Sequence, residues 1–301
     1  MSVGRLSADL RLPLGAAVAV PDGLVTFPQL DIQVPGWAAG RLLRGYRRLV
    51  DLKSNFTNTF AVQITGDEVR LTAAGITLLV RTWGDVDVMH EILVRELYHF
   101  DLGQPCAVWD VGMNVGMASL YFAAMPEVTA VHGYELFRPT CEQARSNFAL
   151  NPTLAPKIKS YAYGLGATTQ ALDLPYHEDL KGVVGLQGPL VSHPGINLRR
   201  EPVEVMPATE ALARIRSSHP TLPVVLKMDC EGAEGEIFES LVVAGMMGDV
   251  ALIMMEWHGT GMRLRLEKLL RDHGFVSISQ PFPGADVGSL TAFRSAAPAT
   301  N

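Results

Sequence analysis

Residues 107–121, AVWDVGMNVGMASLY, decide the fold of this chain. A short apolar run ends on Asp110, a turn with Gly112 and Gly116 follows, and an apolar helical pattern begins directly after it. Such a strand, turn and helix place free backbone N–H groups and the positive end of a helix dipole at one point. Side chains at the two glycines would block the close approach of a ligand or of the helix. The stretch therefore predicts a site for a nucleotide-like ligand, with an ordinary strand-to-helix turn of an α/β protein as the alternative.

The alternation of strand and helix continues along the chain. Apolar runs with strand character are followed by stretches with helical spacing, which indicates a parallel sheet with helices on both faces. The expected strands are 107–110, 128–135, 158–163, 224–229 and 250–256, and the expected helices are 115–124, 139–149, 233–244 and 262–273. Segments 275–280 and 289–294 are joined by a region with no room for a helix, so we expect them to pair antiparallel.

Residues 1–87 form an extension with a different character. Residues 1–35 carry proline and glycine punctuation, which predicts an irregular arm with one short strand. Residues 37–52 have helical spacing and a basic face, which we interpret as solvated surface, with a binding face for an acidic partner as the alternative. The β-rich runs 60–64, 68–72 and 76–81 predict a small antiparallel meander.

The main domain is expected to span residues 88–295. It begins with an amphipathic helix over 88–100, and a short tail at 296–301 follows it. A long insert, 166–223, comes after the third strand of the sheet. Because it leaves the sheet at the carboxyl end of a strand, the insert is a candidate lid or substrate wall.

The composition is that of a compact α/β protein. Hydrophobic residues make up 48% of the 301 residues and charged residues 19%, which argues against disorder. The net charge of -6 gives no bias toward nucleic acid and favours a small substrate. Three cysteines without paired or metal-type spacing predict a reduced, cytoplasmic protein. The apolar run 14–20 lacks a preceding basic cluster, and 241–255 is too short to span a bilayer, so we expect neither export nor a membrane partner.

Three further strand ends carry residues that could complete a ligand site. Glu135 ends the second strand, where a carboxylate can accept hydrogen bonds from ribose hydroxyls; a helix cap or surface acid is the alternative. Gly164 follows the third strand and leaves room for a flat base, although a plain turn explains it nearly as well. Asp229 ends the fourth strand, at the edge where open α/β sheets bind ligands. The helix dipole explains the nearby Glu231 and Glu234 better than it explains Asp229.

Glu256 and His258 end the fifth strand, so they bring a carboxylate and an imidazole to the edge that carries Asp229. A single histidine is usually structural or exposed. Beside two strand-end acids, His258 is a candidate catalytic residue.

Four motifs closely resemble those of the FkbM-type methyltransferases, which use S-adenosylmethionine. They are WDVGMNVG at 109–116, Glu135, LKMDCEGAE at 226–234 and MEWH at 255–258. The third is the most specific, and the resemblance covers about residues 88–273. It implies a Rossmann-like class I methyltransferase fold, an α/β fold whose seven-stranded, mostly parallel sheet has an antiparallel last strand. It also implies methyl transfer to an oxygen of a sugar, polyketide-like or similar small metabolite, as in natural product biosynthesis.

The resemblance also implies cofactor-binding residues. The methionine part of the cofactor would be lined by Asp110, Gly112, Asn114 and Gly116. Glu135 would hold the ribose, and Gly164 and Asp229 are further candidates at the neighbouring strand ends.

Two residues ahead of the first strand, Glu96 and Tyr98, resemble an acid and a tyrosine of the family that would close over the cofactor. Met113 departs from the family, which usually has alanine there. This change is tolerated if the side chain of Met113 points away from the cofactor.

The implied reaction requires the protein to align an acceptor oxygen with the sulfonium methyl group and to remove a proton, leaving S-adenosylhomocysteine. Alignment can supply effective molarities of about 10⁵ M or more, and a base contributes on the order of 10² to 10⁴. His258 and Asp229 are the candidates for that base. A divalent metal held by Asp229, Glu256 and the substrate is an alternative that we do not favour, because no third strongly placed carboxylate is evident.

Two other functions remain open at the level of sequence. One is an NAD-dependent oxidoreductase, but the dinucleotide fingerprint read from Gly112 would need glycines where Asn114 and Met117 stand. The other is a non-catalytic binding protein with a cofactor fold. The expected partner is a small-molecule acceptor; its identity is open, as is a homo-oligomer.

Overall fold

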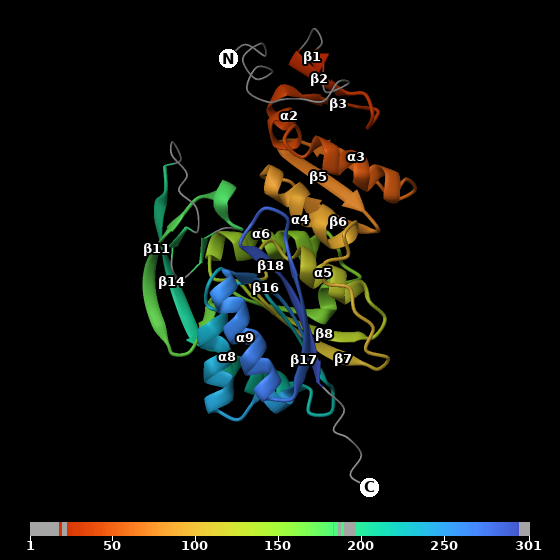
Figure 1. The fold of residues 1–301 in the computed structure, drawn as a ribbon. Coiled ribbons are helices and arrows are strands. Elements are labelled where there is room, and N and C mark those ends of the chain that lie inside the picture. Colours follow the sequence, from red (N-terminus) through yellow and green to blue (C-terminus); the bar gives the residue numbers. More distant parts are fainter. Residues whose placement is uncertain (1–17, 20–22, 183, 186–187, 190–196, 295–301) are drawn as a thin grey trace. The chain divides into compact units, whose positions relative to one another are not determined.

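The computed structural model describes residues 18–19, 23–182, 184–185, 188–189 and 197–294. The chain forms two compact units, residues 1–99 and 100–301 (Figure 1). The expected tail at 296–301 and most of the arm before residue 23 lie outside the described residues.

The described part of the first unit starts with an antiparallel sheet of three short strands, β1 (Val18–Ala19), β2 (Leu24–Phe27) and β3 (Ile32–Pro35). The prediction of an arm with one short strand was therefore wrong. Strands β2 and β3 pair across a tight turn in which Asp31 has a left-handed φ of 58°. Aspartate tolerates this conformation better than most residues, but strands this short give little periodicity to recognise.

The helix expected over 37–52 is two helices, α2 (Gly36–Leu42) and α3 (Tyr46–Asn55). Gly45 separates them, and a Cβ at Gly45 would lie 2.9 Å from the side chain of Val86. The break therefore lies at a close contact with the next helix, α4, and the helical spacing across it concealed the break.

Helix α4 (Trp83–Leu93) begins and ends earlier than the expected 88–100. Thr82 and Asp85 form a capping box, in which the Thr82 N–H donates to Oδ2 of Asp85 at 2.9 Å. After the helix, Glu96 has a left-handed φ of 51°, which an α-helix does not continue through. The predicted meander is confirmed: β4 (Ala61–Thr65), β5 (Glu68–Ala73) and β6 (Ile76–Leu79) form an antiparallel sheet in chain order.

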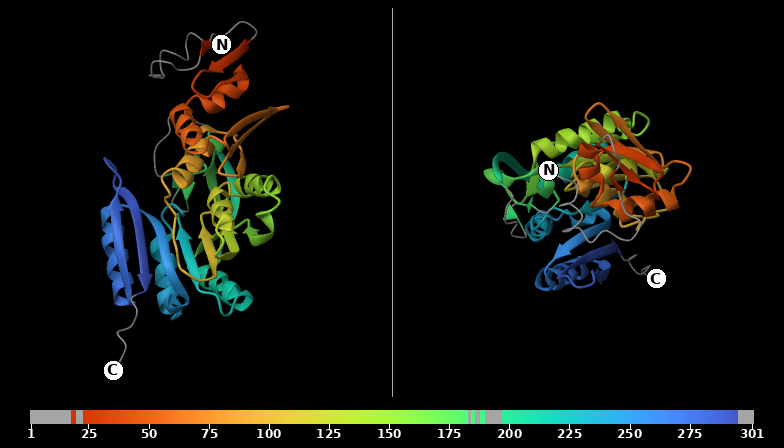
Figure 2. Two further views of the ribbon diagram at one scale, coloured as in Figure 1. Left: turned by 90° about the vertical axis from the view of Figure 1, so that its right-hand side faces the viewer. Right: turned by 90° about the horizontal axis from the view of Figure 1, so that it is seen from above.

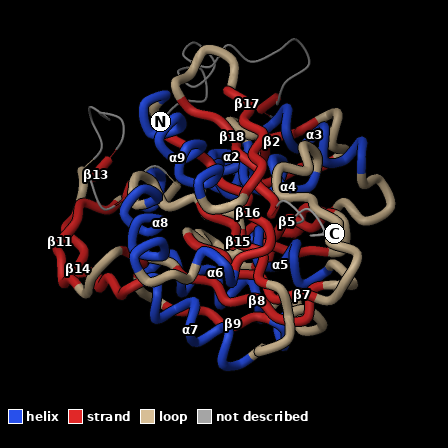
Figure 3. The backbone as a smooth tube through the Cα atoms, turned by 60° about the horizontal axis from the view of Figure 1, so that its bottom comes forward, coloured by secondary structure: helices blue, strands red, loops and turns tan. Residues whose placement is uncertain are grey.

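The second unit is built on a seven-stranded sheet with the order β17-β18-β16-β15-β7-β8-β9 (Figure 3). Its strands are β7 (Cys106–Val111), β8 (Val128–Tyr134), β9 (Ile158–Tyr161), β15 (Val224–Met228), β16 (Val250–His258), β17 (Phe275–Pro281) and β18 (Val287–Arg294). Within this sheet β18 runs antiparallel to both neighbours, and the other pairs are parallel. The predicted strands and the antiparallel pairing of the last two are thereby confirmed. This is a Rossmann-like class I methyltransferase fold.

In the described part of this unit, five helices cover the sheet: α5 (Met117–Ala124), α6 (Arg138–Ala149), α7 (Ala208–Ser218), α8 (Glu234–Val243) and α9 (Thr260–Asp272). The period of two along a strand assigns them to faces. Trp109 is fully buried in one core with residues of α7, α8 and α9. The next residue, Asp110, accepts a hydrogen bond from Ser119 of α5. Helix α5 therefore lies on the face opposite α7, α8 and α9 (Figures 1 and 2).

The expected insert forms a small sheet with the strand just before it, in the order β10-β14-β11. The strands are β10 (Gly164–Gly166), β11 (Gln170–Tyr176) and β14 (Arg199–Pro207). The short strands β12 (Val184–Gly185) and β13 (Gly188–Pro189) pair in a hairpin between them. Three short 3₁₀ helices, at Ala155–Lys157, Glu178–Leu180 and Met247–Asp249, complete the described elements. The third strand of the main sheet ends at Tyr161, and not at residue 163 as expected, because Gly164–Gly166 pairs with β14 instead.

No helix in the described part of the chain is both long and apolar enough to cross a membrane.

Candidate active site

The main sheet changes direction of winding between β7 and β15, which are neighbours although far apart in sequence. Ligands of open α/β sheets bind at the carboxyl ends of the strands at such a point. A cavity of about 610 Å³, counted with the space open to solvent, lies there. Its lining residues are Val111, Gly112, Asn114, Tyr134, Glu135, Leu136, Gly164, Leu165, Lys181, Gly182, Gly185, Asp229, Cys230, Glu231 and Ala233.

The turns after β7 and β15 lie directly against each other. The Asp229 N–H donates to the carbonyl of Val111 at 3.0 Å. Gly112 has a left-handed φ of 76°, and a Cβ on it would lie 1.7 Å from the carbonyl oxygen of Asp229. Only glycine fits this position, both for its backbone angle and for its space.

Asp110 lies beneath these turns and does not line the cavity. Its side chain is fully buried, Ser119 donates a hydrogen bond to its Oδ2 at 2.6 Å, and the ammonium of Lys227 lies 3.3 Å from its Oδ1. Gly116 is not a lining residue either, since a Cβ there would lie 2.5 Å from the ring of Phe148 in α6. Both residues therefore stabilise the turn through contacts outside the cavity.

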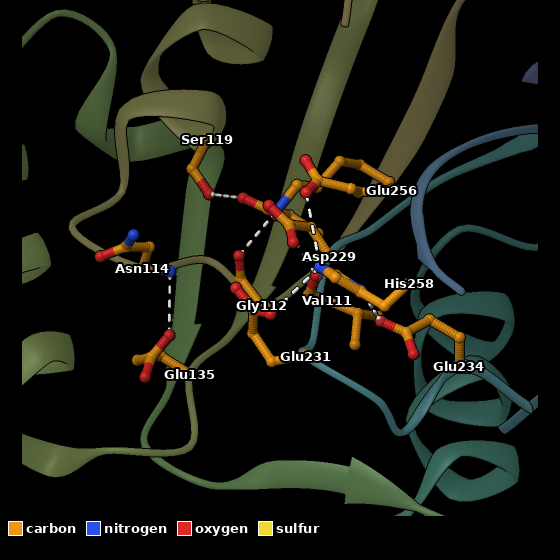
Figure 4. Close-up of polar contacts among 12 residues, drawn as sticks. Val111, Gly112, Asn114, Ser119, Glu135, Asp229, Glu231, Glu234, Glu256 and His258 are labelled. Atoms are coloured by element: carbon orange, nitrogen blue, oxygen red, sulfur yellow. Dashed lines mark hydrogen bonds and ion pairs between the residues drawn. The ribbon is translucent and has the colours of Figure 1, made fainter. Parts of the chain in front are cut away.

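Glu135 is held in place by two backbone amides, and Figure 4 shows one of them, that of Asn114. The N–H of Asn114 donates to its Oε2 at 2.9 Å, and the N–H of Phe137 donates to its Oε1 at 3.0 Å. Each oxygen keeps a second acceptor position. Burial raises the pKa of Glu135 to about 7, although the two amide hydrogen bonds and the charge of Lys227 act in the opposite direction.

Asn114 lines the cavity next to Glu135. Its φ is 51°, so the side chain leaves the turn from a left-handed backbone, and its amide oxygen Oδ1 is buried without a hydrogen-bond partner among the described residues. An unpaired buried acceptor beside a cavity is costly unless a ligand supplies the donor. The preceding residue, Met113, is 1% exposed and packs its sulfur against Gly133. Its side chain therefore points away from the cavity, which is the condition under which a methionine was expected to be tolerated here.

Four carboxylates and one imidazole meet at the ends of β15 and β16 (Figure 4). Nε2 of His258 lies 3.2 Å from Oε2 of Glu231 and 3.4 Å from Oε1 of Glu256, and Nδ1 lies 3.8 Å from Oε1 of Glu234. Asp229 is the fourth acid, beside Glu256. Of these five side chains, those of Asp229 and Glu231 line the cavity.

The charges of this cluster shift each other's pKa values. Burial by itself lowers the pKa of His258, but contacts with Glu234 and Glu256 and the charge of Glu231 raise it to about 11. Burial and the charge of Glu256 raise the pKa of Asp229 to about 6, against the lowering effect of Lys227 and His258. Burial and the charge of Asp229 raise the pKa of Glu231 to about 8. At neutral pH His258 is therefore an imidazolium.

The structure brings together most of the residues predicted from the sequence. Gly112, Asn114, Glu135, Gly164 and Asp229 line the cavity. Glu256 and His258 contact each other near Asp229, but neither lines the cavity. Glu96 and Tyr98 belong to the first compact unit, residues 1–99.

Other lining residues were missed by sequence reasoning. Lys181, Gly182 and Gly185 of the expected insert form one wall. Lys181 donates to Oε1 of Gln143 at 2.9 Å, and a Cβ on Gly185 would lie 2.1 Å from the carbonyl of Glu231. The glycine-rich composition of 181–188 was the available signal.

Among the described residues, no group of three or more His, Cys, Asp and Glu side chains is arranged to hold a metal ion.

No protein-family model and no curated protein sequence matches this chain. Among solved structures, the methyltransferase FkbM from Methylobacillus flagellatus KT is similar with a TM-score of 0.46 and 15% identity, over 67% of this chain and 47% of that one. The N-terminal domain of human METTL16, in complex with SAH, has a TM-score of 0.42 and 13% identity, over 97% and 93%. Streptococcus pneumoniae Sp1610, assigned as a tRNA (m1A22) methyltransferase and bound to S-adenosyl-L-methionine, has a TM-score of 0.37 and 13% identity, over 65% and 70%. The fold class stated above rests on the strand order and strand directions of the sheet.

Proposed function

We propose that this chain is an S-adenosylmethionine-dependent methyltransferase that methylates a hydroxyl oxygen of a small acceptor, as the resemblance to FkbM-type enzymes implies. The observation that carries the proposal is the cavity at the ends of β7, β8 and β15, with Glu135 fixed by two backbone amides at one end and Asp229 at the other. An acid at the end of the second strand suits a ribose diol, and an acid at the end of the fourth suits proton removal.

The residues of the cavity fit this cofactor. Glu135 has acceptor positions left for the two ribose hydroxyls. The unpaired Oδ1 of Asn114 can accept from the ammonium of the methionine part, and Gly112 adds no side chain that would exclude it. Gly164 and Leu165 would face the base. The roles of Glu96 and Tyr98 in closing over the cofactor remain predictions from the sequence.

Asp110 and Gly116 enter this proposal as supports. Asp110 holds the turn through Ser119 and Lys227, and Gly116 lets α6 pack against it. Their substitution is expected to weaken cofactor binding although neither side chain would touch the cofactor.

When bound, the cofactor supplies an electrophilic methyl carbon on its sulfonium sulfur. The chain aligns the acceptor oxygen and accepts its proton. We assign the proton to a carboxylate oxygen of Asp229, which lines the cavity and whose pKa, raised to about 6, leaves it ionised yet basic at neutral pH. Glu256 contributes the negative charge that raises this pKa.

His258 takes a different role from the candidate base of the sequence prediction. With a pKa of about 11 it already carries its proton, so it has no free lone pair at neutral pH. We propose that it is a positioning cation that holds Glu231, Glu234 and Glu256 together behind Asp229.

The test is mass spectrometry of reactions supplied with methyl-labelled cofactor and either a small-metabolite fraction or total RNA. Label in a small hydroxyl compound, lost in Asp229→Asn and kept in the exposed control Asp173→Asn, supports the proposal. Label in RNA would keep the methyltransferase and overturn the small acceptor. No transfer to any acceptor, with no cofactor binding, would overturn both.

A further inference from the structure

Lys227 is a buried cation between the two turns that form the cavity floor. Its side chain is 3% exposed. In the ladder between β15 and β7, Lys227 and Asp110 are direct partners, so both side chains leave the sheet on the same face. Parallel sheets of this kind have nearly continuous apolar strands, which makes a charged pair at this place exceptional.

One ammonium group makes several contacts from this position. Nζ donates to the carbonyl of Gly112 at 2.6 Å, lies 3.3 Å from Oδ1 of Asp110, and lies 4.0 Å from Oδ2 of Asp229. Burial by itself lowers the pKa of Lys227, but the charges of Asp110 and Asp229 raise it above its ordinary value. The group therefore stays positive.

These contacts join two functions that the site needs. The carbonyl of Gly112 belongs to the turn after β7, whose neighbouring residue Asn114 fixes Glu135. Asp229 is the acid on the opposite turn. A charge within about 4–6 Å changes a carboxyl pKa by about 1–3 units.

We propose that Lys227 is a positioning residue that fixes the cofactor turn through the Gly112 carbonyl and, shared between Asp110 and Asp229, sets the protonation of Asp229. The role of Lys227 in catalysis rests on the proposed function. The electrostatic coupling between Lys227 and Asp229 does not depend on that function.

Among the other charged groups around Asp229, His258 acts on the pKa of Asp229 in the same direction as Lys227, whereas the acids act in the opposite direction. From β16, Glu256 raises the pKa of Asp229 and His258 lowers it, and Glu234 of α8 raises it. Burial and the charge of Asp229 in turn raise the pKa of Glu231, which lies in the loop before α8. From β7, Asp110 competes with Asp229 for the ammonium. Removing the charge of Lys227 should therefore raise the pKa of Asp229, and removing the charge of Asp110 should lower it.

The experiment is a carboxyl ¹³C NMR titration of aspartate-labelled protein without cofactor, with Asp229 assigned by its loss in Asp229→Asn. Lys227→Met is expected to raise the titration midpoint of Asp229 by about 1–3 pH units. Asp110→Asn is expected to lower this midpoint, because the ammonium of Lys227 then has Asp229 as its only charged partner of the two. The control Lys268→Met removes an exposed lysine of α9 and should leave the midpoint unchanged.

Lys227→Met alone leaves Asp110 buried without its cation and could fail to fold. The double variant Asp110→Asn/Lys227→Met removes both charges and is expected to show the raised midpoint, and Asp110→Asn is an independent arm. An unchanged midpoint in Asp110→Asn, or a shift in the same direction as that of the double variant, would overturn the inference. Opposite shifts in a protein that transfers no methyl group would leave Lys227 coupled to Asp229 and reject only the proposed function.

Discussion

Gly112 packs its backbone against Asp229 so closely that a Cβ on Gly112 would lie 1.7 Å from the carbonyl oxygen of Asp229. The turn proposed to hold the cofactor and the turn that carries the proposed base thus fix each other. A substitution that displaces either turn should therefore displace the other.

Gly112→Ala is expected to lower the free energy of unfolding by more than its backbone strain. The left-handed φ of 76° costs an alanine about 1–2 kcal/mol, and the clash with Asp229 adds about 1–3 kcal/mol. Gly274→Ala is the matched control, because Gly274 has a φ of 83° and nothing within 4 Å of an added Cβ. Urea unfolding measures both variants. Equal losses would contradict the interlock of the two turns.

Glu135 should make cofactor affinity depend on pH. Its ionised carboxylate accepts ribose hydroxyls better than its protonated form, and its pKa is raised to about 7. Affinity for S-adenosylhomocysteine, measured by calorimetry, is therefore expected to rise as pH increases through 7.

In Glu135→Gln this pH dependence should be absent, and affinity at pH 8 should fall about 10- to 100-fold, the value of a charged hydrogen bond. The exposed Glu142→Gln on α6 should behave as the wild type. A wild-type pH profile in Glu135→Gln would remove Glu135 from the ribose site.

His258 should not titrate near neutrality. Because its pKa is raised to about 11, its ring is expected to keep a proton on both nitrogens between pH 5 and 9, which NMR of the ring nitrogens measures. A folded-state pKa above the ordinary 6.5 stabilises the protein; this contribution is complete below pH 6.5, declines as pH rises above 6.5, and is gone above about pH 11.

His258→Gln should raise the midpoint of the acidic limb of the rate profile, since His258 lowers the pKa of Asp229. If His258 were the base, the variant would instead lose turnover at every pH. His273→Gln, at the end of α9, is the control.

His132 should make the second unit sensitive to acid. It is fully buried on β8, its Nε2 lies 3.3 Å from Nε2 of His219, and its ring stacks on Tyr161. Burial, with the charges of His219, Lys159 and Arg214, lowers its pKa to about 4.

The unfolded chain therefore binds this proton near pH 6.5 and the folded chain near 4, so stability is complete above 6.5 and falls between the two values. His132→Phe should lose less stability than the wild type between pH 6.5 and 4.5 in urea unfolding. The exposed His99→Gln should follow the wild type; identical slopes for His132→Phe and the wild type would refute the assignment.

The main sheet could be predicted because its strands are nearly continuous apolar runs separated by glycine turns. Where boundaries were missed, the cause was tertiary. Gly45 breaks a helix at its contact with Val86, and Gly164–Gly166 leaves the main sheet to pair with β14. Neither contact follows from local spacing.

The candidate site was predictable where it lies at strand ends, as Glu135 and Asp229 do. It was not predictable where its properties depend on distant partners. The imidazolium of His258 depends on Glu234 and Glu231 of another segment as well as on Glu256 of its own strand, and Lys181 reaches the cavity through the path of the insert. Lys227 stood within the most specific motif, but its contact with the Gly112 carbonyl joins residues on different strands.

The most direct test of the proposed cofactor site is isothermal titration of the full chain with S-adenosylmethionine, S-adenosylhomocysteine and NAD. Both sulfur nucleosides are expected to bind, Glu135→Gln is expected to weaken both about 10- to 100-fold, and NAD is expected to give no heat. Binding of NAD alone, or equal binding of the sulfur nucleosides by wild type and Glu135→Gln, would contradict the proposed site.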